Sequence, residues 1–319
     1  MKILIADKFE DIGLQQLREI TDDVVCEPGL KDESLTQRMT EYAPNVLVVR
    51  STKVEAPTLD AGKDLKLIIR AGSGFNTIDT AGAKERGIKV ANCPGMNAVA
   101  VAELVMGHMI ALDRRLGDNL ADLRAHKWNK KLYSQSRGLK GRTLGIVGAG
   151  AIGRAVAQRA LAFEMKVLWY DILPDIKVAD HPDCQRAELD RIFRESDFLT
   201  LHVPGTGDTK HLVNAERLAS MKPEAILINT SRSSVVDEPA LIAALKAGQL
   251  RAAAVDVYEN EPAADAKEID SPLADVPNLY GSHHIGASTE QAQFAVAEEV
   301  VRIIREFKNT GQVLNWVNQ

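Results

Sequence analysis

Near the middle of the chain lies Thr143-Leu-Gly-Ile-Val-Gly148-Ala-Gly150-Ala-Ile-Gly153-Arg154, an apolar β-branched run that leads into Gly-x-Gly-x-x-Gly. Each glycine has a physical reason in a strand–turn–helix unit. The first permits the tight turn, the second lets a phosphate group approach the backbone, and the third lets the helix pack against the strand. Taken alone the pattern is weak, because a glycine-rich turn can also be an ordinary loop.

The surroundings of the turn decide its meaning. An Ala-rich helical segment, 155–162, follows the turn, and a second strand ends at Asp171, 18 residues after Gly153. This order predicts a dinucleotide site whose pyrophosphate lies at the helix N-terminus. A carboxylate at Asp171 would accept hydrogen bonds from ribose hydroxyls and repel a 2′-phosphate, and Ile172-Leu-Pro-Asp175 supplies no cation. The sequence therefore favours NAD over NADP.

Outward from this turn, short β-branched runs alternate with amphipathic segments along nearly the whole chain, which predicts an α/β fold with parallel sheets. The first series forms a unit of about 95 residues and ends at Cys93-Pro-Gly-Met-Asn97, an expected crossing between domains. Its strands are predicted at 3–6, 46–49, 67–69 and 89–91, and its helices include 11–20 and 34–42.

The second series begins with an apolar helix predicted over 98–116. It has so little polar surface that we expect it to be buried, either within the chain or against a second subunit. The last helix is predicted over 291–308, after the capping stretch Ser288-Thr289-Glu290. The strands between them are predicted at 143–147, 166–170, 198–203, 225–229 and 252–257.

Composition limits the classes of protein that the chain can belong to. It has 319 residues, 45% hydrophobic and 26% charged, which suits two globular domains. A net charge of -5 argues against non-specific binding to nucleic acid or anionic membranes. Three scattered cysteines predict reduced thiols and no metal site. The apolar runs are too short for a signal peptide or a membrane span, so we expect a soluble, cytoplasmic protein.

Candidate reactive side chains follow three later strands. Arg232 comes after the strand 225–229, Glu261 follows the strand 252–257, and His284 comes just beyond 278–281. Parallel strands bring their carboxyl ends to one edge, where an Arg can fork onto a substrate carboxylate. A His there can move a hydroxyl proton, and a Glu can fix its tautomer. Each residue also has a simpler interpretation, as a surface ion pair, a structural histidine or a solvated carboxylate.

The whole chain resembles the D-isomer-specific 2-hydroxyacid dehydrogenases, and within them the 3-phosphoglycerate dehydrogenases. The resemblance implies that Arg232, Glu261 and His284 are the catalytic set, with His284 as acid/base. The motifs that carry it, in the family's order, are Arg70-Ala-Gly-Ser-Gly74 with Ile78-Asp79, the turn at 148–153, Asn229-Thr-Ser-Arg232 with Val236-Asp237-Glu238, Asp256-Val-Tyr258 with Glu261-Pro262, and His284-Ile-Gly286-Ala-Ser-Thr289.

The same resemblance implies two Rossmann-like doubly wound domains. Residues 1–97 plus 287–319 would form a substrate-binding lid, residues 98–286 would bind NAD, and closure would exclude water. Expected cofactor contacts are Ser73, Gly148, Gly150, Ala151, Ile152, Gly153, Asp171, Val203, Pro204, Thr230, Ser231, Arg232, Asp256, His284 and Gly286. Expected substrate contacts are Arg50, Arg70, Ser73, Gly74, Asn97, Arg232 and His284.

Three residues depart from the family pattern. Ser233 stands where a glycine is usual, so a positive φ there would be strained. His283 replaces the usual proline before the catalytic histidine, so the choice of His284 depends on the Ile-Gly that follows it. Glu164 replaces a common glycine before the second strand, at no expected functional cost.

Cations in the first domain favour a phosphorylated substrate. Val49-Arg50-Ser-Thr-Lys53 and Arg70 resemble the phosphoglycerate enzymes, as does the run Lys127-Trp-Asn-Lys-Lys131 in the second domain, and guanidinium groups bind phosphate bidentately. The alternatives are that Arg50 and Lys53 form surface ion pairs and that the lysine run is merely solvated. The expected reaction is NAD-dependent oxidation of 3-phospho-D-glycerate to 3-phosphohydroxypyruvate, as in serine biosynthesis.

Other functions remain open within the resemblance. One is a glyoxylate/hydroxypyruvate reductase or another D-2-hydroxyacid dehydrogenase, and a non-enzymatic one is an NAD-sensing corepressor. The family also implies a homodimer formed through the cofactor domain. The chain stops at Gln319, so feedback through a C-terminal regulatory domain is not expected.

Overall fold

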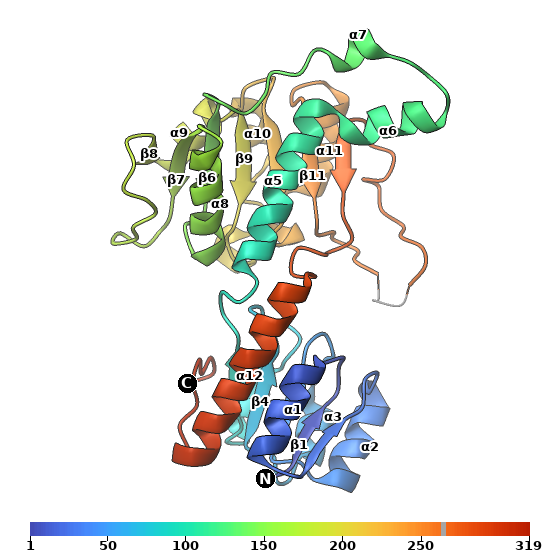
Figure 1. Ribbon diagram of the computed structural model, residues 1–319, viewed down its shortest axis with the longest axis vertical. Coiled ribbons are helices and arrows are strands. Elements are labelled where there is room, and N and C mark those ends of the chain that lie inside the picture. The colour runs from blue at the N-terminus through green and yellow to red at the C-terminus, as the bar shows by residue number, and fades with distance from the viewer. Residues whose placement is uncertain (263–265) are drawn as a thin grey trace. The chain divides into compact units, whose positions relative to one another are not determined.

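The computed structural model describes residues 1–262 and 266–319. These residues form two compact units, one of Met1–Asn97 with Ser288–Gln319 and the other of Ala98–Ala287. In Figure 1 the smaller unit is blue with a red C-terminal helix, and the larger unit runs from green to orange. The sequence places the second crossing after Gly286, one residue before the observed boundary.

The smaller unit is built on five parallel strands in the order β2-β1-β3-β4-β5. This is the flavodoxin-like doubly wound order, which reverses between β1 and β3. The strands are β1 (Ile3–Ile5), β2 (Val24–Cys26), β3 (Val46–Val49), β4 (Leu67–Arg70) and β5 (Lys89–Asn92). The helices are α1 (Asp11–Ile20), α2 (Asp32–Tyr42), α3 (Ala56–Ala61), α4 (Thr80–Glu85) and α12 (Glu290–Thr310).

Helices cover both faces of this sheet. On one face α1 and α12 pack together, and Leu17 and Ile304 join the core there. On the other face α2 and α3 contribute Leu35 and Leu59. The capping stretch before α12 is confirmed, because Thr289 Oγ1 accepts a hydrogen bond from the Ala292 amide at 3.2 Å.

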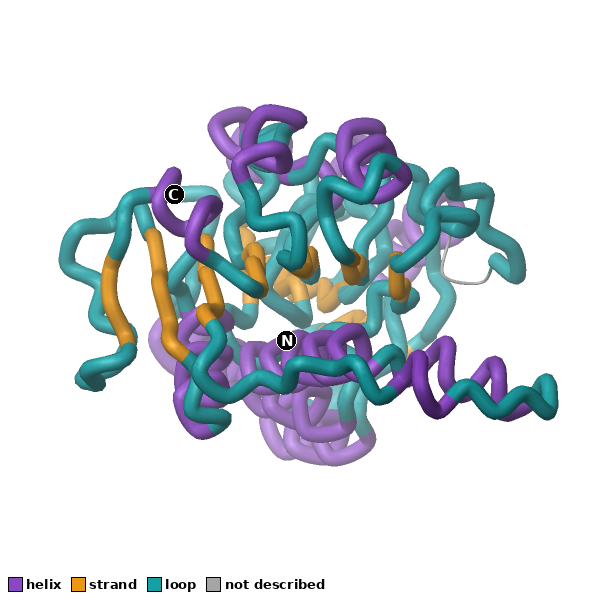
Figure 2. The backbone as a smooth tube through the Cα atoms, turned by 90° about the horizontal axis from the view of Figure 1, so that it is seen from above, coloured by secondary structure: helices purple, strands orange, loops and turns teal. Residues whose placement is uncertain are grey.

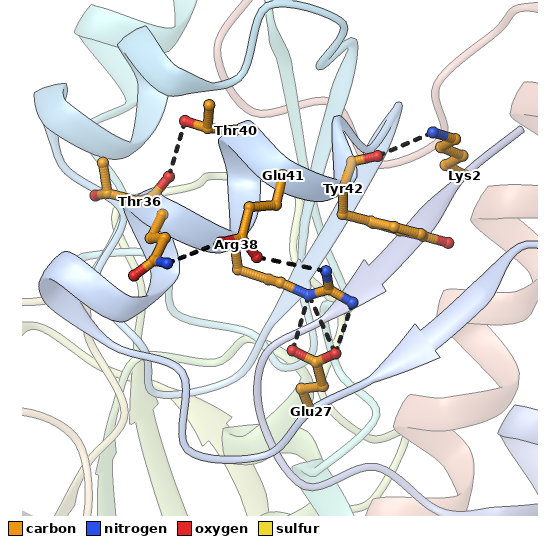
Figure 3. Close-up of polar contacts among 8 residues, drawn as sticks. Lys2, Glu27, Thr36, Arg38, Thr40, Glu41 and Tyr42 are labelled. Atoms are coloured by element: carbon orange, nitrogen blue, oxygen red, sulfur yellow. Dashed lines mark hydrogen bonds and ion pairs between the residues drawn. The ribbon is translucent and has the colours of Figure 1, made fainter.

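Figure 3 shows how polar contacts tie α2 to the rest of the smaller unit. The Arg38 guanidinium donates to both carboxylate oxygens of Glu27 at 2.7 to 3.1 Å, and it lies 5.1 Å from the centre of the Tyr42 ring. Lys2 Nζ donates to the Tyr42 carbonyl oxygen at 3.1 Å. The charge of Arg38 is therefore paired with Glu27 inside the smaller unit.

The larger unit is built on seven parallel strands in the order β12-β11-β10-β9-β6-β7-β8. The order reverses between β6 and β9, as in a Rossmann sheet. The strands are β6 (Thr143–Val147), β7 (Lys166–Tyr170), β8 (Cys184–Arg186), β9 (Phe198–Leu201), β10 (Ile226–Asn229), β11 (Ala252–Val255) and β12 (Leu279–Gly281). The helices are α5 (Ala98–Arg114), α6 (Leu116–Arg124), α7 (Lys130–Tyr133), α8 (Ala151–Ala162), α9 (Leu189–Glu195), α10 (Ala215–Ser220) and α11 (Glu238–Lys246).

Figures 1 and 2 show helices on both sides of these strands. On one face, α5 and α8 pack together and contribute Val105 and Val156 to the core. On the other, α9, α10 and α11 contribute side chains such as Phe193 and Leu241. Within the described residues no helix is long and apolar enough to cross a membrane.

The first helix of the larger unit differs from its prediction in two ways. It ends at Arg114, two residues early, because Arg115 takes the left-handed conformation with φ 52°. Its apolar face is covered by α8, β10 and β11 of the same unit, so its burial needs no second subunit. Val99 of α5 is still 53% exposed, and the next helix, α6, has no buried residue and carries the exposed Leu116, Leu120 and Leu123.

Candidate active site

The strand register aligns the carboxyl ends of six neighbouring strands in the larger unit. The paired residues at these ends are Tyr170, Val147, Leu201, Asn229, Val255 and Gly281. The glycine-rich turn, Thr230-Ser231-Arg232, Asp256 and the segment 282–286 each begin within one residue of that row. Neighbouring strands lie about 4.8 Å apart, so these segments share one edge of the sheet. The sequence prediction of a common edge within this unit is confirmed.

The three glycines of the turn have different surroundings. Gly148 has φ +94°, and a Cβ there would lie 2.4 Å from the His202 carbonyl oxygen. A Cβ on Gly153 would lie 2.1 Å from the Gly148 carbonyl oxygen, which reflects the close packing of α8 on the turn. A Cβ on Gly150 would meet nothing within 4 Å. The second glycine therefore faces open space, as close approach by a ligand requires.

These features fit a dinucleotide pyrophosphate. Gly150 precedes α8, a helix of 12 residues, without a side-chain cap. The amides of Ala151 and Ile152 belong to its first turn, where no intrahelical acceptor is available. Such amides, together with the helix dipole, favour an anion. At the same edge, Thr230 Oγ1 is buried without a hydrogen-bond partner among the described residues, so it can bind a polar ligand group.

Asp171 lies at the end of β7 beside the turn. Its carboxylate accepts hydrogen bonds from the Ala149 amide at 2.7 Å and the Leu173 amide at 3.0 Å. These bonds fix the carboxylate next to the first glycine. The position is the one expected for a group that contacts a ribose.

Sequence reasoning missed a cation near Asp171. Arg186, on β8, donates to the carbonyl oxygens of Asp171 at 2.7 Å and of Pro174 at 2.6 Å, and it lies 5.4 Å from the centre of the Trp169 ring. The residues directly after Asp171 do lack a cation, but the fold supplies one from the neighbouring strand. Because β8 is a short, largely exposed strand, its sequence gave no signal of this position.

Glu261 and His284 form a direct pair. His284 Nδ1 lies 2.6 and 2.8 Å from the two carboxylate oxygens of Glu261, and both side chains are partly exposed at 47% and 41%. A carboxylate only accepts hydrogen bonds, so Nδ1 carries the proton. Nε2 is thereby left as the nitrogen that can exchange a proton with a ligand.

Asp256 shapes the loop that carries this histidine. The carboxylate is 1% exposed and accepts hydrogen bonds from Ser282 Oγ at 2.6 Å, the Ile285 amide at 2.9 Å and the Gly286 amide at 2.8 Å. His284 itself has φ +51°, a left-handed conformation that costs a non-glycine residue about 1 kcal/mol or more. A direct contact of Asp256 with a cofactor stays a prediction.

Arg232 follows β10 at the same edge. Val203 and Pro204 follow β9, the strand that pairs with β10. Arg232 Nη1 donates to the Ser231 carbonyl oxygen at 2.7 Å, and the stem of this side chain would be 3.1 Å from a Cβ on Gly205. Among the described residues it has no hydrogen bond to Glu261 or His284. The strain anticipated at Ser233 is absent, because this residue begins a short 3-10 helix and lacks a positive φ.

In the smaller unit, the two expected phosphate ligands end adjacent strands. Arg70 is the last residue of β4 and pairs in register with Val49, which directly precedes Arg50. Asp7 accepts hydrogen bonds from the amides of Arg50 at 2.6 Å and Thr52 at 3.2 Å, and so it fixes the loop after β3. Among described residues no ion pair involves the Arg50 side chain, so the simple surface-pair interpretation finds no support there. Lys53 likewise has no ion pair in this part of the chain.

The remaining expected contacts of the smaller unit lie close together. Ser73 Oγ is 2.9 Å from Asn97 Oδ1 and 3.3 Å from the Cys93 carbonyl oxygen. Gly74 follows directly in the same loop. This cluster is a polar loop beyond β4, where it can present a hydroxyl and an amide.

The lysine run lies elsewhere. Lys127, Lys130 and Lys131 are exposed on the α6–α7 segment, which in Figure 1 extends away from the sheet of the larger unit. Neighbouring residues of this segment line a cavity with Ala252 and Asn278, at the amino ends of β11 and β12. Within one chain the run is therefore not at the edge that holds the glycine turn.

Comparison with known proteins agrees with this geometry. Residues 106–286 match the family model for the D-isomer specific 2-hydroxyacid dehydrogenase, NAD binding domain. The chain belongs to this family. It is an oxidoreductase that acts on a CH–OH group with NAD(P).

Individual relatives have different substrates. The dehydrogenase is 42% identical to the hydroxypyruvate reductase of Thermotoga maritima over 97% of this chain and 98% of the relative. It is 39% identical to the D-3-phosphoglycerate dehydrogenase of Methanocaldococcus jannaschii over 96% of this chain, which spans 58% of that relative. The solved NADPH-dependent glyoxylate/hydroxypyruvate reductase of Sinorhizobium meliloti, in complex with NADP and malonate, superimposes with a TM-score of 0.81 at 29% identity over 99% of this chain and 96% of that one.

Proposed function

We propose that the dehydrogenase oxidises 3-phospho-D-glycerate to 3-phosphohydroxypyruvate with NAD. The observation that supports this substrate most strongly is the pair of arginines at adjacent strand ends of the smaller unit. Arg50 has no ion pair among the described residues, and Arg70 ends the neighbouring strand. A phosphate carries nearly two negative charges, so two guanidinium groups suit it in a protein that is acidic overall.

The larger unit would supply the chemistry. His284 takes the proton of the C2 hydroxyl on Nε2, because Nδ1 is committed to Glu261. Glu261 stabilises the imidazolium that forms, and Arg232 orients the substrate carboxylate through its planar fork. A bound nicotinamide cofactor would supply the acceptor for the hydride that leaves C2. His283, the neighbouring imidazole, has no such carboxylate partner among the described residues.

We assign the cofactor to the turn between β6 and α8. The amides of Ala151, Ile152 and Gly153 would hold the pyrophosphate, Asp171 the adenine-side ribose, and the segment Thr230–Arg232 the nicotinamide half. We infer a preference for NAD, because a 2′-phosphate would meet the Asp171 carboxylate, and both terminal nitrogens of Arg186 are already bonded to carbonyl oxygens. Steady-state rates with each cofactor test this, and a kcat/KM at least as high with NADP would contradict it.

A second candidate is hydroxypyruvate reductase. It is favoured by the match to the Thermotoga maritima enzyme, which covers nearly all of both chains. This activity needs the same His284, Glu261 and Arg232, but no phosphate contact.

A panel of acids separates the two candidates. NADH absorbance would be followed with 3-phosphoglycerate in the oxidative direction, and with hydroxypyruvate and glyoxylate in the reductive direction. In the oxidative direction, we expect kcat/KM to be higher for 3-phosphoglycerate than for unphosphorylated D-glycerate. Efficient turnover of hydroxypyruvate with no detectable turnover of phosphoglycerate would support the second candidate instead.

We also propose a homodimer formed through the cofactor unit. The face of α6 carries Leu116, Leu120 and Leu123 at helical spacing, all exposed, and Trp128 follows at 81% exposure. A short helix without buried residues is marginal alone, so a partner surface would stabilise it. Light scattering should give twice the chain mass for the wild type and a monomer for Leu120→Arg. A monomeric wild type would contradict the proposal.

A further inference from the structure

A buried polar row lies between α5 and the sheet of the larger unit. His108 on α5 has Nε2 3.1 Å from Ser282 Oγ, and Ser282 Oγ lies 2.6 Å from Asp256 Oδ1. All three residues are less than 9% exposed. In a helix whose other buried members are almost all apolar, His108 is an exception that packing alone does not explain.

The number of protons on each group determines the direction of these hydrogen bonds. A carboxylate only accepts, so the single hydroxyl proton of Ser282 points to Asp256. Ser282 Oγ must then accept from His108, which requires the proton to be on Nε2. Burial lowers the pKa of His108, so a neutral imidazole makes this bond at neutral pH. The order differs from a hydrolytic triad, in which the imidazole lies between the hydroxyl and the carboxylate.

The row ends at the loop that carries the proposed acid/base. The Asp256 carboxylate holds the amides of Ile285 and Gly286, and Tyr258 donates its hydroxyl proton to the Ser282 carbonyl oxygen at 2.9 Å. His284 lies between these anchors in the left-handed conformation. A conformation of this cost persists only where the surroundings over-determine it.

We infer that His108 is a positioning residue for the reaction, which acts through Ser282 and Asp256 to hold the backbone at 284–286 so that His284 stays directed at the substrate. The inference rests on the proposed acid/base role of His284. His108 itself touches none of the reacting groups. Without the hydrogen bond from His108, the Ser282 hydroxyl loses the donor that fixes it against the Asp256 carboxylate, and the loop gains freedom.

The test uses variants of His108 and Ser282, because Asp256 is also an expected cofactor contact. His108→Leu removes the hydrogen bond and keeps an apolar side chain of similar size, whereas His108→Gln keeps an N–H donor. Loss of one neutral hydrogen bond should lower kcat about fivefold in His108→Leu, with KM for NAD and for the acid changed less than twofold. His108→Gln should restore kcat to within twofold of the wild type.

A double-mutant cycle tests whether His108 acts through Ser282. Ser282→Ala should lower kcat about as much as His108→Leu, and the double variant should be no worse than Ser282→Ala alone, because the bonds act in series. Multiplicative losses in the double variant, or a His108→Leu enzyme with full kcat, would overturn the inference. So would a His108→Gln enzyme as slow as His108→Leu.

A readout independent of turnover separates this inference from the proposed function. Amide hydrogen exchange at Ile285 and Gly286, followed by NMR, should be about tenfold faster in His108→Leu and unchanged in His108→Gln. Unchanged exchange in His108→Leu would refute the network even where His284 is essential. Full turnover in His284→Asn would refute the acid/base role, while the exchange data still report on the network.

Discussion

The two sheets of this dehydrogenase have the same doubly wound design but treat charge differently at their carboxyl edges. At the edge of the seven-stranded sheet, side chains hydrogen-bond to one another, as in the His284–Glu261 and Ser282–Asp256 pairs. At the edge of the five-stranded sheet, Asp7 fixes the backbone of the loop, and the Arg50 side chain has no ion pair among described residues. One edge holds the proposed proton-transfer pair, and the other presents a cation.

The contrast shows that the fold places an edge and the residues just beyond the strands decide its use. In the larger unit a carboxylate after β11 is bonded to backbone amides and holds a loop. In the smaller unit the carboxylate after β1 does the same for the loop after β3, and it thereby presents Arg50. Similar backbone devices thus support the proposed acid/base pair in one unit and the proposed anion site in the other.

The largest effect that this comparison predicts is at Glu261. Glu261→Gln should lower kcat about 100-fold, because the imidazole loses the charge that stabilises its protonated form and the acceptor that fixes its tautomer. Steady-state kinetics measure this. Glu259→Gln, two residues earlier, is the matched control and should keep wild-type kcat. Loss of less than twofold in Glu261→Gln would show that the pair is structural.

The next effect concerns the glycine turn. Gly150→Ala meets no neighbouring atom, so it should fold normally and raise KM for NAD about 30-fold by obstructing the phosphate. Gly107→Ala on α5 also has open space and should leave KM unchanged. Melting temperatures of both variants should match or exceed the wild type. A normal KM for NAD in Gly150→Ala would place the pyrophosphate elsewhere.

A smaller and more selective effect is expected at the other edge. Arg50→Gln should raise KM for 3-phosphoglycerate about tenfold and leave KM for glyoxylate unchanged, because only the first substrate has a phosphate. Arg38→Gln is the control in the same unit, since its guanidinium is already bound to Glu27. Equal effects of Arg50→Gln on both acids would show that this edge does not recognise phosphate.

The smallest expected effect is on acid stability. Burial lowers the pKa of His202 from 6.5 to about 3, so the unfolded chain takes up this proton before the folded one does. The contribution to stability is complete above pH 6.5 and is lost as the pH falls toward 3. At about pH 5 the loss is about 2 kcal/mol.

His202→Gln should remove most of that pH-dependent loss. Urea unfolding, followed by circular dichroism at neutral pH and at about pH 5, measures it. His126→Asn, at an exposed position, should keep the pH dependence of the wild type. An unchanged pH dependence in His202→Gln would show that the ring is not buried as a neutral group.

Local patterns in the sequence were sufficient for most of the fold. The strands at 46–49, 143–147 and 166–170 have the predicted bounds, since each is a buried run between polar segments. The edge strands β2 and β8 were missed because the apolar run of β2 is only three half-buried residues long and β8, Cys184–Arg186, has no apolar run. The predicted strands 198–203 and 252–257 end two residues early, and their last residues leave the sheet to form the site.

The site was less accessible to sequence reasoning than the fold. Family motifs indicated Glu261 and His284, and the structure pairs them. No motif pointed to Arg186 or to His108, whose partner Ser282 is 174 residues away. Such contacts depend on how distant elements pack, and a lone histidine in an apolar helix gives no sign of what it meets.

The most direct test of the central claim is the rate of hydride transfer in a single turnover of His284→Asn, with saturating NAD and D-hydroxy acid. We expect NADH to form about a thousandfold more slowly than in the wild type, while NAD binding measured by calorimetry stays within twofold. NADH formation at the wild-type rate in this variant would contradict the assignment of His284 as the group that takes the hydroxyl proton.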